Sequence, residues 1–186
     1  MTTLTSSTCT IPSILSKAEH GARASLSREG VFELNWPNYR ERDILIDTLE
    51  LEADPYDLAI RGNNVRARGT LGFDSASPIP ELEWDHMSTT LYAIVINQGG
   101  KAAQNLVSTV NGIGLRKSSA NIVKPAPLTD VRFGFEARVY VKMGHLWVRS
   151  AWEFFHGEAK VASFDMLSIG VQRDYEELQA KRSPGQ

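Results

Sequence analysis

The chain has 186 residues, of which 42% are hydrophobic and 23% are charged, and its net charge at pH 7 is −2. These values are ordinary for one globular domain, and they exclude a protein that coats nucleic acid through bulk positive charge. The single cysteine excludes a disulfide framework. No apolar run reaches the roughly 20 residues of a membrane span, and the first residues lack the pattern of a signal peptide, so we expect neither.

The composition changes along the chain and predicts three parts. Residues 1–30 are rich in Ser and Thr and poor in large apolar side chains, so we expect a flexible amino-terminal arm. Residues 31–172 are expected to form a single β-rich globular domain, and residues 173–186 a short helical or loose tail. The apolar residues of the arm are candidates for hooking a neighbouring copy of the chain, and these are Ile11, Ile14 and Leu15.

The first half of the domain is expected to be mostly strands. Residues 31–36 and 43–52 have strand-like composition, and residues 57–73 read as two short strands around a tight turn at Gly62-Asn63-Asn64. Residues 89–97 form a nearly continuous apolar run, which fits either a central strand or a buried helix. Their β-branched content favours the strand.

The second half adds a helix and further strands. Residues 101–115 place apolar side chains at three- and four-residue spacing, which predicts a helix that ends at Gly112 and Gly114. Residues 146–155 and 160–171 are expected to be strands.

The most regular stretch lies between Val131 and Met143, where apolar residues occupy every second position. Successive strand side chains point to opposite faces, so this stretch predicts a strand with one buried and one charged face. The expected fold class is therefore mainly β (α+β): a compact antiparallel sheet or sandwich of seven to eight strands with one or two helices.

The sequence lacks the usual signatures of catalysis. There is no phosphate-binding loop and no nucleophile elbow, and the four histidines show no metal-ligand spacing. Asp85 and His86 place an acid beside a base, but adjacent residues of a strand point to opposite faces, so they make a poor dyad and a loop or edge role fits them better. We therefore expect no enzyme, no cofactor and no metal.

One group of residues is coherent in charge. Basic side chains recur on the polar faces of two predicted strands and beside the predicted helix, where they are candidates for contact with RNA phosphate, lipid phosphate or nucleoprotein. They are Arg66, Arg68, Arg132, Arg138, Lys142, Arg116 and Lys117. Trp147 is expected on the outer face of its strand, as a self-association contact.

The segment Trp84-Asp85-His86-Met87, with strands before it and a helix and further strands after it, resembles the matrix proteins of rhabdoviruses, above all those that infect plants. The resemblance implies a viral structural protein that self-associates, condenses the nucleocapsid and bridges it to the envelope. The implied partners are further copies of the chain, the viral nucleoprotein–RNA complex and the anionic inner leaflet. The implied location is the virion and the host cytoplasm, peripheral to membranes.

Two alternatives remain open. One is a jelly-roll capsid or movement protein of a plant virus, which the strand count allows. The other is a small-molecule-binding β-barrel or an enzyme, in which Trp84, His86, His145 and Trp147 would line the mouth of a pocket.

Overall fold

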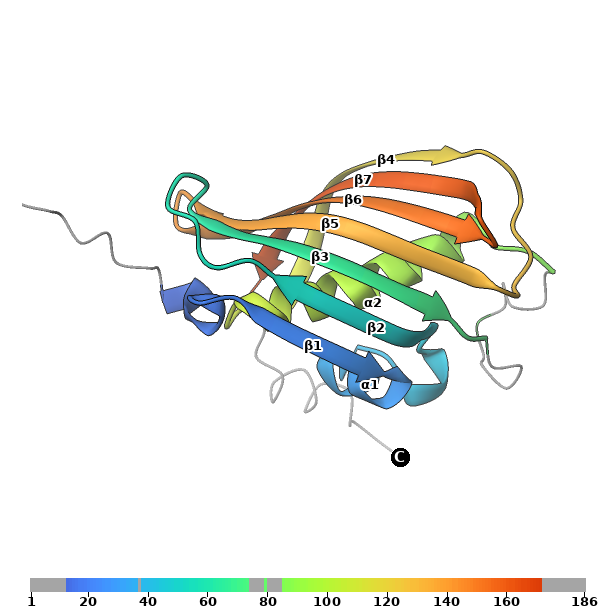
Figure 1. Ribbon diagram of the computed structural model, residues 1–186, viewed down its shortest axis with the longest axis horizontal. Coiled ribbons are helices and arrows are strands. Elements are labelled where there is room, and N and C mark those ends of the chain that lie inside the picture. Colours follow the sequence, from blue (N-terminus) through green and yellow to red (C-terminus); the bar gives the residue numbers. More distant parts are fainter. Residues whose placement is uncertain (1–12, 37, 74–78, 80–84, 172–186) are drawn as a thin grey trace, which may run out of the picture.

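In the computed structural model, the described residues are 13–36, 38–73, 79 and 85–171. They form one seven-stranded sheet with the strand order β1-β2-β3-β5-β6-β7-β4, in which every neighbouring pair is antiparallel (Figure 1). Two α-helices accompany it, which confirms the expected mainly β, antiparallel class. The strands are β1 (Ala22–Ser27), β2 (Ile46–Ala53), β3 (Gly62–Leu71), β4 (Gly112–Ile122), β5 (Val131–Lys142), β6 (His145–His156) and β7 (Ala159–Val171).

The long helix α2 (Thr89–Val107) lies against one face of the sheet, and the short helix α1 (Arg28–Asn35) lies near β1 and β2 (Figure 1). Two 3-10 turns, η1 (Ser13–Ala18) and η2 (Glu41–Asp43), complete the described elements. Since α2 connects β3 to β4, the chain crosses from the middle of the sheet to its edge through this helix. We call the face toward α2 the inner face and the opposite one the outer face.

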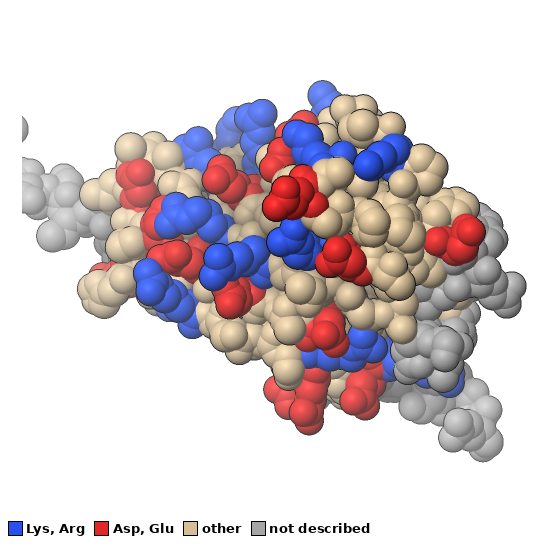
Figure 2. Space-filling view, turned by 45° about the vertical axis from the view of Figure 1, so that its right-hand side comes forward, with Lys and Arg blue, Asp and Glu red and all other residues tan. Residues whose placement is uncertain are grey.

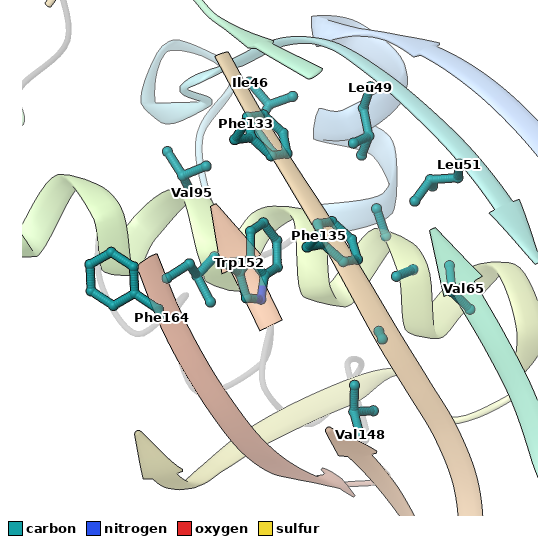
Figure 3. Packing of buried hydrophobic residues seen from close by; sticks show 14 of the residues in the cluster. Ile46, Leu49, Leu51, Val65, Val95, Phe133, Phe135, Val148, Trp152 and Phe164 are labelled. Atoms are coloured by element: carbon teal, nitrogen blue, oxygen red, sulfur yellow. The ribbon is translucent and has the colours of Figure 1, made fainter. Parts of the chain in front are cut away.

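The strand β5 shows the alternation that its sequence predicts. Its apolar residues, from Val131 to Val141, are buried at every second position, while the residues between them are exposed or half-buried. The buried ones pack on the inner face, where the rings of Phe135 and Trp152 stack with centroids 3.9 Å apart (Figure 3). This aromatic layer fills the space between the sheet and α2.

The helix α2 corrects two expectations. Residues 89–97 are helical and not a strand, and the helix continues through Gly99 and Gly100 to Val107. A Cβ atom at Gly99 would lie 2.8 Å from Cη2 of Trp152, so the absence of a side chain there lets the indole pack on the helix backbone. The predicted helix therefore ends earlier than residue 115, and residues 112–115 belong instead to β4.

A buried glutamine fixes α2 to the segment before β2. The side chain of Gln98 is fully buried; its Oε1 accepts from Leu45 N at 3.0 Å, and its Nε2 donates to Asp43 O at 2.8 Å. Asn35 of α1 donates to the backbone oxygen of Gln98 at 3.2 Å. Burial of an amide that has these hydrogen-bond partners costs little free energy. The hydrogen bonds also specify one arrangement of the two helices and β2.

The amino-terminal part also differs from expectation. Residues 31–36 belong mostly to α1, which begins after Ser27, whose Oγ accepts from Gly30 N. Within the expected arm of residues 1–30, η1 and β1 join the fold, so residues 13–30 are not a flexible arm. Residues 1–12 and the expected tail at 173–186 lie outside the described residues.

Candidate active site

The amino end of α2 is well defined. Ser88 is the N-cap, and its Oγ accepts from Leu91 N at 3.2 Å. The first turn of any helix leaves backbone N–H groups without intrahelical acceptors, and the aligned peptide dipoles give this end a partial positive charge. No acidic side chain lies in the first turn of α2. This end of the helix can therefore stabilise negative charge that develops nearby.

An acid and a base lie immediately before this cap. The Nδ1 atom of His86 lies 3.0 Å from Oδ1 of Asp85. An ionised carboxylate only accepts, so Nδ1 donates, which leaves the other ring nitrogen as the basic one. The hydrogen bond with His86 lowers the pKa of Asp85, as do its own backbone amide and the charge of the imidazole. The carboxylate therefore stays ionised and orients the ring.

Asp85 and His86 lie in a bend and an isolated β-bridge with Pro127 and not in a strand, so the rule that adjacent strand residues point to opposite faces does not apply to them. The next residue, Met87, is buried, and its N donates to Ala126 O at 2.7 Å. The backbone is thus held against Ala126 and Pro127, while the Asp85 side chain is fully exposed and that of His86 is 47% exposed.

Tyr92 lies one turn further along α2 and is fully buried. Its ring contacts Phe154 and Phe164, with centroid distances of 4.7 and 5.2 Å. Burial raises the pKa of its hydroxyl to about 12, so the group stays protonated. Its oxygen has no hydrogen-bond partner among the described residues. Tyr92 lies in a run of apolar residues, so no sequence pattern indicated a buried hydroxyl at this position.

The structure brings five of the predicted basic residues to one surface. The side chains of two strands, β3 and β5, carry them on the outer face, and they are Arg66, Arg68, Arg132, Arg138 and Lys142. This surface is mixed in charge, as Figure 2 shows in the alternation of blue and red side chains. Arg66 pairs with Asp54 and Arg68 with Glu50, each at 2.6 Å. A role of these residues in contact with phosphate or nucleoprotein stays a prediction.

The other predicted residues are dispersed. Arg116 and Lys117 lie on β4 at the sheet edge, and not at the carboxyl end of a helix. Ile11 lies outside the described residues, and Ile14 is half-buried. Leu15 is fully buried in the core and is not accessible to a neighbouring copy, which corrects that expectation.

The expected pocket mouth is not formed. His145 opens β6 beside Lys142, whereas His86 bridges Pro127, shortly before the opposite end of β5. A strand of the length of β5 spans about 36 Å, so these two histidines lie far apart. Trp147 is on the outer face of β6, and Trp84 lies outside the described residues. Within residues 13–36, 38–73, 79 and 85–171, no three His, Cys, Asp or Glu side chains are grouped as metal ligands.

No family model and no curated protein matches the chain. Solved structures do resemble it. A mutant thioesterase from Pseudomonas aeruginosa has a TM-score of 0.46 and 12% identity, over 78% of this chain and 94% of its own. A hot-dog-like protein from Thermanaerovibrio acidaminovorans has a TM-score of 0.43 and 17% identity, over 67% and 93%.

A third similar structure is a putative thioesterase, a phenylacetic acid degradation-related protein from Ralstonia eutropha, with a TM-score of 0.39 and 9% identity over 63% and 82% of the two chains. All three TM-scores are below 0.5, so the function is argued below from the residues of this chain.

These likenesses correct the expected function. The three similar structures are named as hot-dog and thioesterase proteins, which contradicts the expectations of a viral matrix-type protein, of a protein that is not an enzyme, and of a place in the virion and the host cytoplasm. A jelly roll needs two packed sheets, whereas the described residues form one sheet against a helix. The alternative of a small-molecule-binding β fold or an enzyme fits better. Neither α1 nor α2 has the length and apolar composition of a membrane-crossing helix.

Proposed function

We propose that this chain is an enzyme that hydrolyses a small activated acyl compound, a thioester or an ester, with His86 as the general base. The observation that supports the proposal is the 3.0 Å hydrogen bond between His86 Nδ1 and Asp85 Oδ1 at the amino end of α2. Thioesterase is also what two of the similar structures are called, and we therefore take thioesters as the first substrates to test.

The chemistry follows from the roles of the groups. The imidazole removes a proton from water, and the water oxygen forms a bond to the acyl carbon. The negative charge that develops on the carbonyl oxygen is stabilised by the amino end of α2. The intermediate then breaks its bond to sulfur or oxygen, and the leaving group takes the proton from the imidazolium. Asp85 stays ionised and holds the ring in the required tautomer throughout.

Self-association stays part of the proposal. The strand β4 is bonded to β7 on one side only, and its residues 116–122 are all exposed. Apolar side chains mark both ends of this stretch: Leu115 is 56% and Val123 is 58% exposed. A long edge strand with exposed apolar residues favours pairing with another chain. We expect two copies to pair through β4, beside the segment that leads to Ala126 and Pro127.

Hydrolysis assays test the catalytic proposal. Purified protein is assayed with a panel of acyl-coenzyme A thioesters and p-nitrophenyl esters. His86→Ala is expected to lower kcat/KM by about 10²- to 10⁴-fold, the usual loss for a general base. Asp85→Asn is expected to cause a smaller loss, because the ring stays but its tautomer is no longer fixed. His145→Ala is the matched control, since this exposed histidine lies at the other end of β5 and β6. Full activity of His86→Ala would refute the assignment.

Sedimentation velocity over a range of protein concentrations tests the pairing. Leu115→Lys combined with Val123→Lys is expected to shift a dimer to monomer. Leu58→Lys is the control, because Leu58 is as exposed, at 58%, but lies outside β4. A wild-type chain that remains a monomer at every concentration would contradict pairing through β4.

A further inference from the structure

The outer face of the β5–β6 hairpin carries three rows of paired side chains. The register places Arg138 opposite Arg149, Tyr140 opposite Trp147, and Lys142 opposite His145. All six side chains are exposed or half-buried on the face away from α2. We call these six residues the hairpin patch. Its order along the strands is basic, aromatic, basic.

The arginine row lies in a surface hollow whose lining also includes the acidic residues Glu136 and Asp165. Two like charges directly opposite each other on neighbouring strands destabilise a sheet. Neither Arg138 nor Arg149 forms an ion pair with any described residue; the guanidinium of Arg138 instead lies 5.5 Å from the centroid of the Tyr140 ring. By contrast, Arg66 and Arg68 on the same face are each paired with a carboxylate. An anion bound between Arg138 and Arg149 would remove this repulsion.

The aromatic row is flanked by neutral groups. In register, Gly62 lies beside Tyr140 and Ile169 lies beside Trp147, so no carboxylate occupies this row. The indole nitrogen of Trp147 donates to Lys142 O at 3.3 Å, which ties the ring to the hairpin backbone. Because the Arg138 guanidinium lies over the Tyr140 ring, Trp147 is the ring of this row that we expect to stack on a base.

The spacing of the rows selects the ligand. Residues two apart on a strand are about 7 Å apart, so a cationic row lies about 7 Å to either side of the aromatic row. The two cationic rows are therefore about 13 Å apart, about the length of two extended nucleotides, so a single strand laid along the hairpin can place phosphates at the outer rows and a base on the aromatic row between them. We infer that the hairpin patch binds a short segment of single-stranded nucleic acid. This inference is independent of the proposed hydrolytic function.

The arrangement favours single-stranded nucleic acid over a membrane surface as the ligand of the hairpin patch. Met143, at the hairpin turn, is 87% exposed and flanked by Lys142, a pattern that would suit insertion of the tip into lipid. However, Arg138 and Arg149 lie about 13 Å behind the tip along the strands, which exceeds the Debye length of about 8 Å at physiological salt. A membrane that contacted the tip would therefore not contact the arginine row, whereas a nucleic-acid strand laid along the outer face would contact all three rows.

Fluorescence anisotropy with a labelled twelve-nucleotide oligo(dT) tests the inference at low salt. Trp147→Ala is expected to weaken binding at least tenfold, because the loss of an aromatic ring that stacks on a base usually lowers affinity by about this much. Arg149→Gln is expected to weaken binding about fivefold and to reduce the slope of log K against log salt by about 0.7, because one phosphate contact is lost. Arg23→Gln is the control, since Arg23 lies in the same outer-face row as Glu52 and Arg66, but on β1 at the far edge of the sheet and outside the patch. Its affinity is expected to equal that of the wild type.

Further measurements keep these outcomes separate. Trp147→Phe retains a stacking ring and is expected to bind within about threefold of the wild type, so a loss in Trp147→Ala with a normal melting curve is a loss of stacking. The inference fails if oligo(dT) does not bind, or if Arg23→Gln weakens binding as much as Arg149→Gln. It also fails if adenosine monophosphate competes as well as the oligonucleotide, or if phosphatidylserine vesicles bind the protein and the oligonucleotide does not.

Discussion

Trp152 and Trp147 lie on the same strand, β6, but on opposite faces of the sheet. Trp152 is 1% exposed and stacks on Phe135 beneath the backbone of Gly99. Trp147 is half-buried on the outer face, beside Tyr140 and among charged side chains. The inner face is therefore fixed by close packing, where each atom has a neighbour. The outer face contributes less to stability and can accommodate a ligand without disturbing the fold.

The largest expected effect tests the difference between the two tryptophans directly. Trp152→Ala is expected to lower the free energy of unfolding by about 3–5 kcal/mol, because it removes buried area and leaves a cavity. Trp147→Ala is expected to lower it by about 1 kcal/mol or less, as for a surface side chain away from the core. Urea denaturation measures both. Equal losses in the two variants would show that the faces do not differ in this way.

The two adjacent glycines of α2 sharpen the contrast within the inner layer. Gly99→Ala forces its Cβ to within 2.8 Å of Trp152 and is expected to destabilise by about 1–2 kcal/mol, the cost of overpacking less the gain in helix propensity. At Gly100 the nearest atom would be 3.9 Å away, so Gly100→Ala is expected to stabilise by up to about 1 kcal/mol. Thermal melts of both variants check the opposite signs. The same sign in both would exclude the proposed contact.

Tyr92 tests whether the inner layer tolerates a polar group. Tyr92→Phe removes a buried hydroxyl without a partner among the described residues and is expected to stabilise by about 1 kcal/mol. Burial raises the pKa of Tyr92 to about 12, whereas a tyrosine in the unfolded chain titrates near 10. Above pH 10 the unfolded chain therefore binds fewer protons than the native one, and stability falls as the pH rises toward 12.

Tyr39, whose pKa burial also raises to about 12, contributes to the same loss. Urea midpoints between pH 8 and 11 should therefore fall less steeply in Tyr92→Phe than in the wild type. Identical slopes would mean that the Tyr92 hydroxyl is not buried in solution.

The smallest expected effect lies on the outer face. The ion pair between Arg68 and Glu50 has an N–O distance of 2.6 Å, but the side chains are 81% and 54% exposed. Arg68→Gln is expected to change the free energy of unfolding by less than about 0.5 kcal/mol, and the change should vanish at high salt. Urea denaturation with and without 0.5 M salt measures this change. A loss of stability as large as in Gly99→Ala would contradict the proposed difference between the inner and outer faces of the sheet.

The alternation of β5 was visible in the sequence because its outer residues are charged. The run at 89–97 has the burial period of a helix, with Leu91, Tyr92, Val95 and Ile96 buried, but its exposed position 93 is an alanine and its half-buried position 94 an isoleucine. No polar face therefore marked the helical period in this part of α2. Its β-branched residues then favoured a strand, and Gly99-Gly100 indicated a break, because the indole that fills the space comes from a distant part of the sequence.

The candidate site could be predicted only in part. The types of Asp85 and His86 were recognised, but their relation depended on whether the backbone is a strand or a bend, which is decided by the contacts with Ala126 and Pro127. The common face of Arg66, Arg68, Arg132, Arg138 and Lys142 followed from alternation within β3 and β5, as the structure has it. Their partners did not, because Asp54 and Glu50 lie on or beside a different strand.

The packing of Trp152 against Gly99 also fixes the direction of the α2 axis. Gly99 lies ten residues from the start of α2, about 15 Å along its axis, and His86 lies just beyond that start. If the helix pivoted at the indole by about 4°, its amino end would swing by about 1 Å, a displacement large enough to cost an enzyme about a hundredfold in rate. The close contact at Gly99, a residue that takes no part in the chemistry, therefore also affects the position of the His86 imidazole near the amino end of α2.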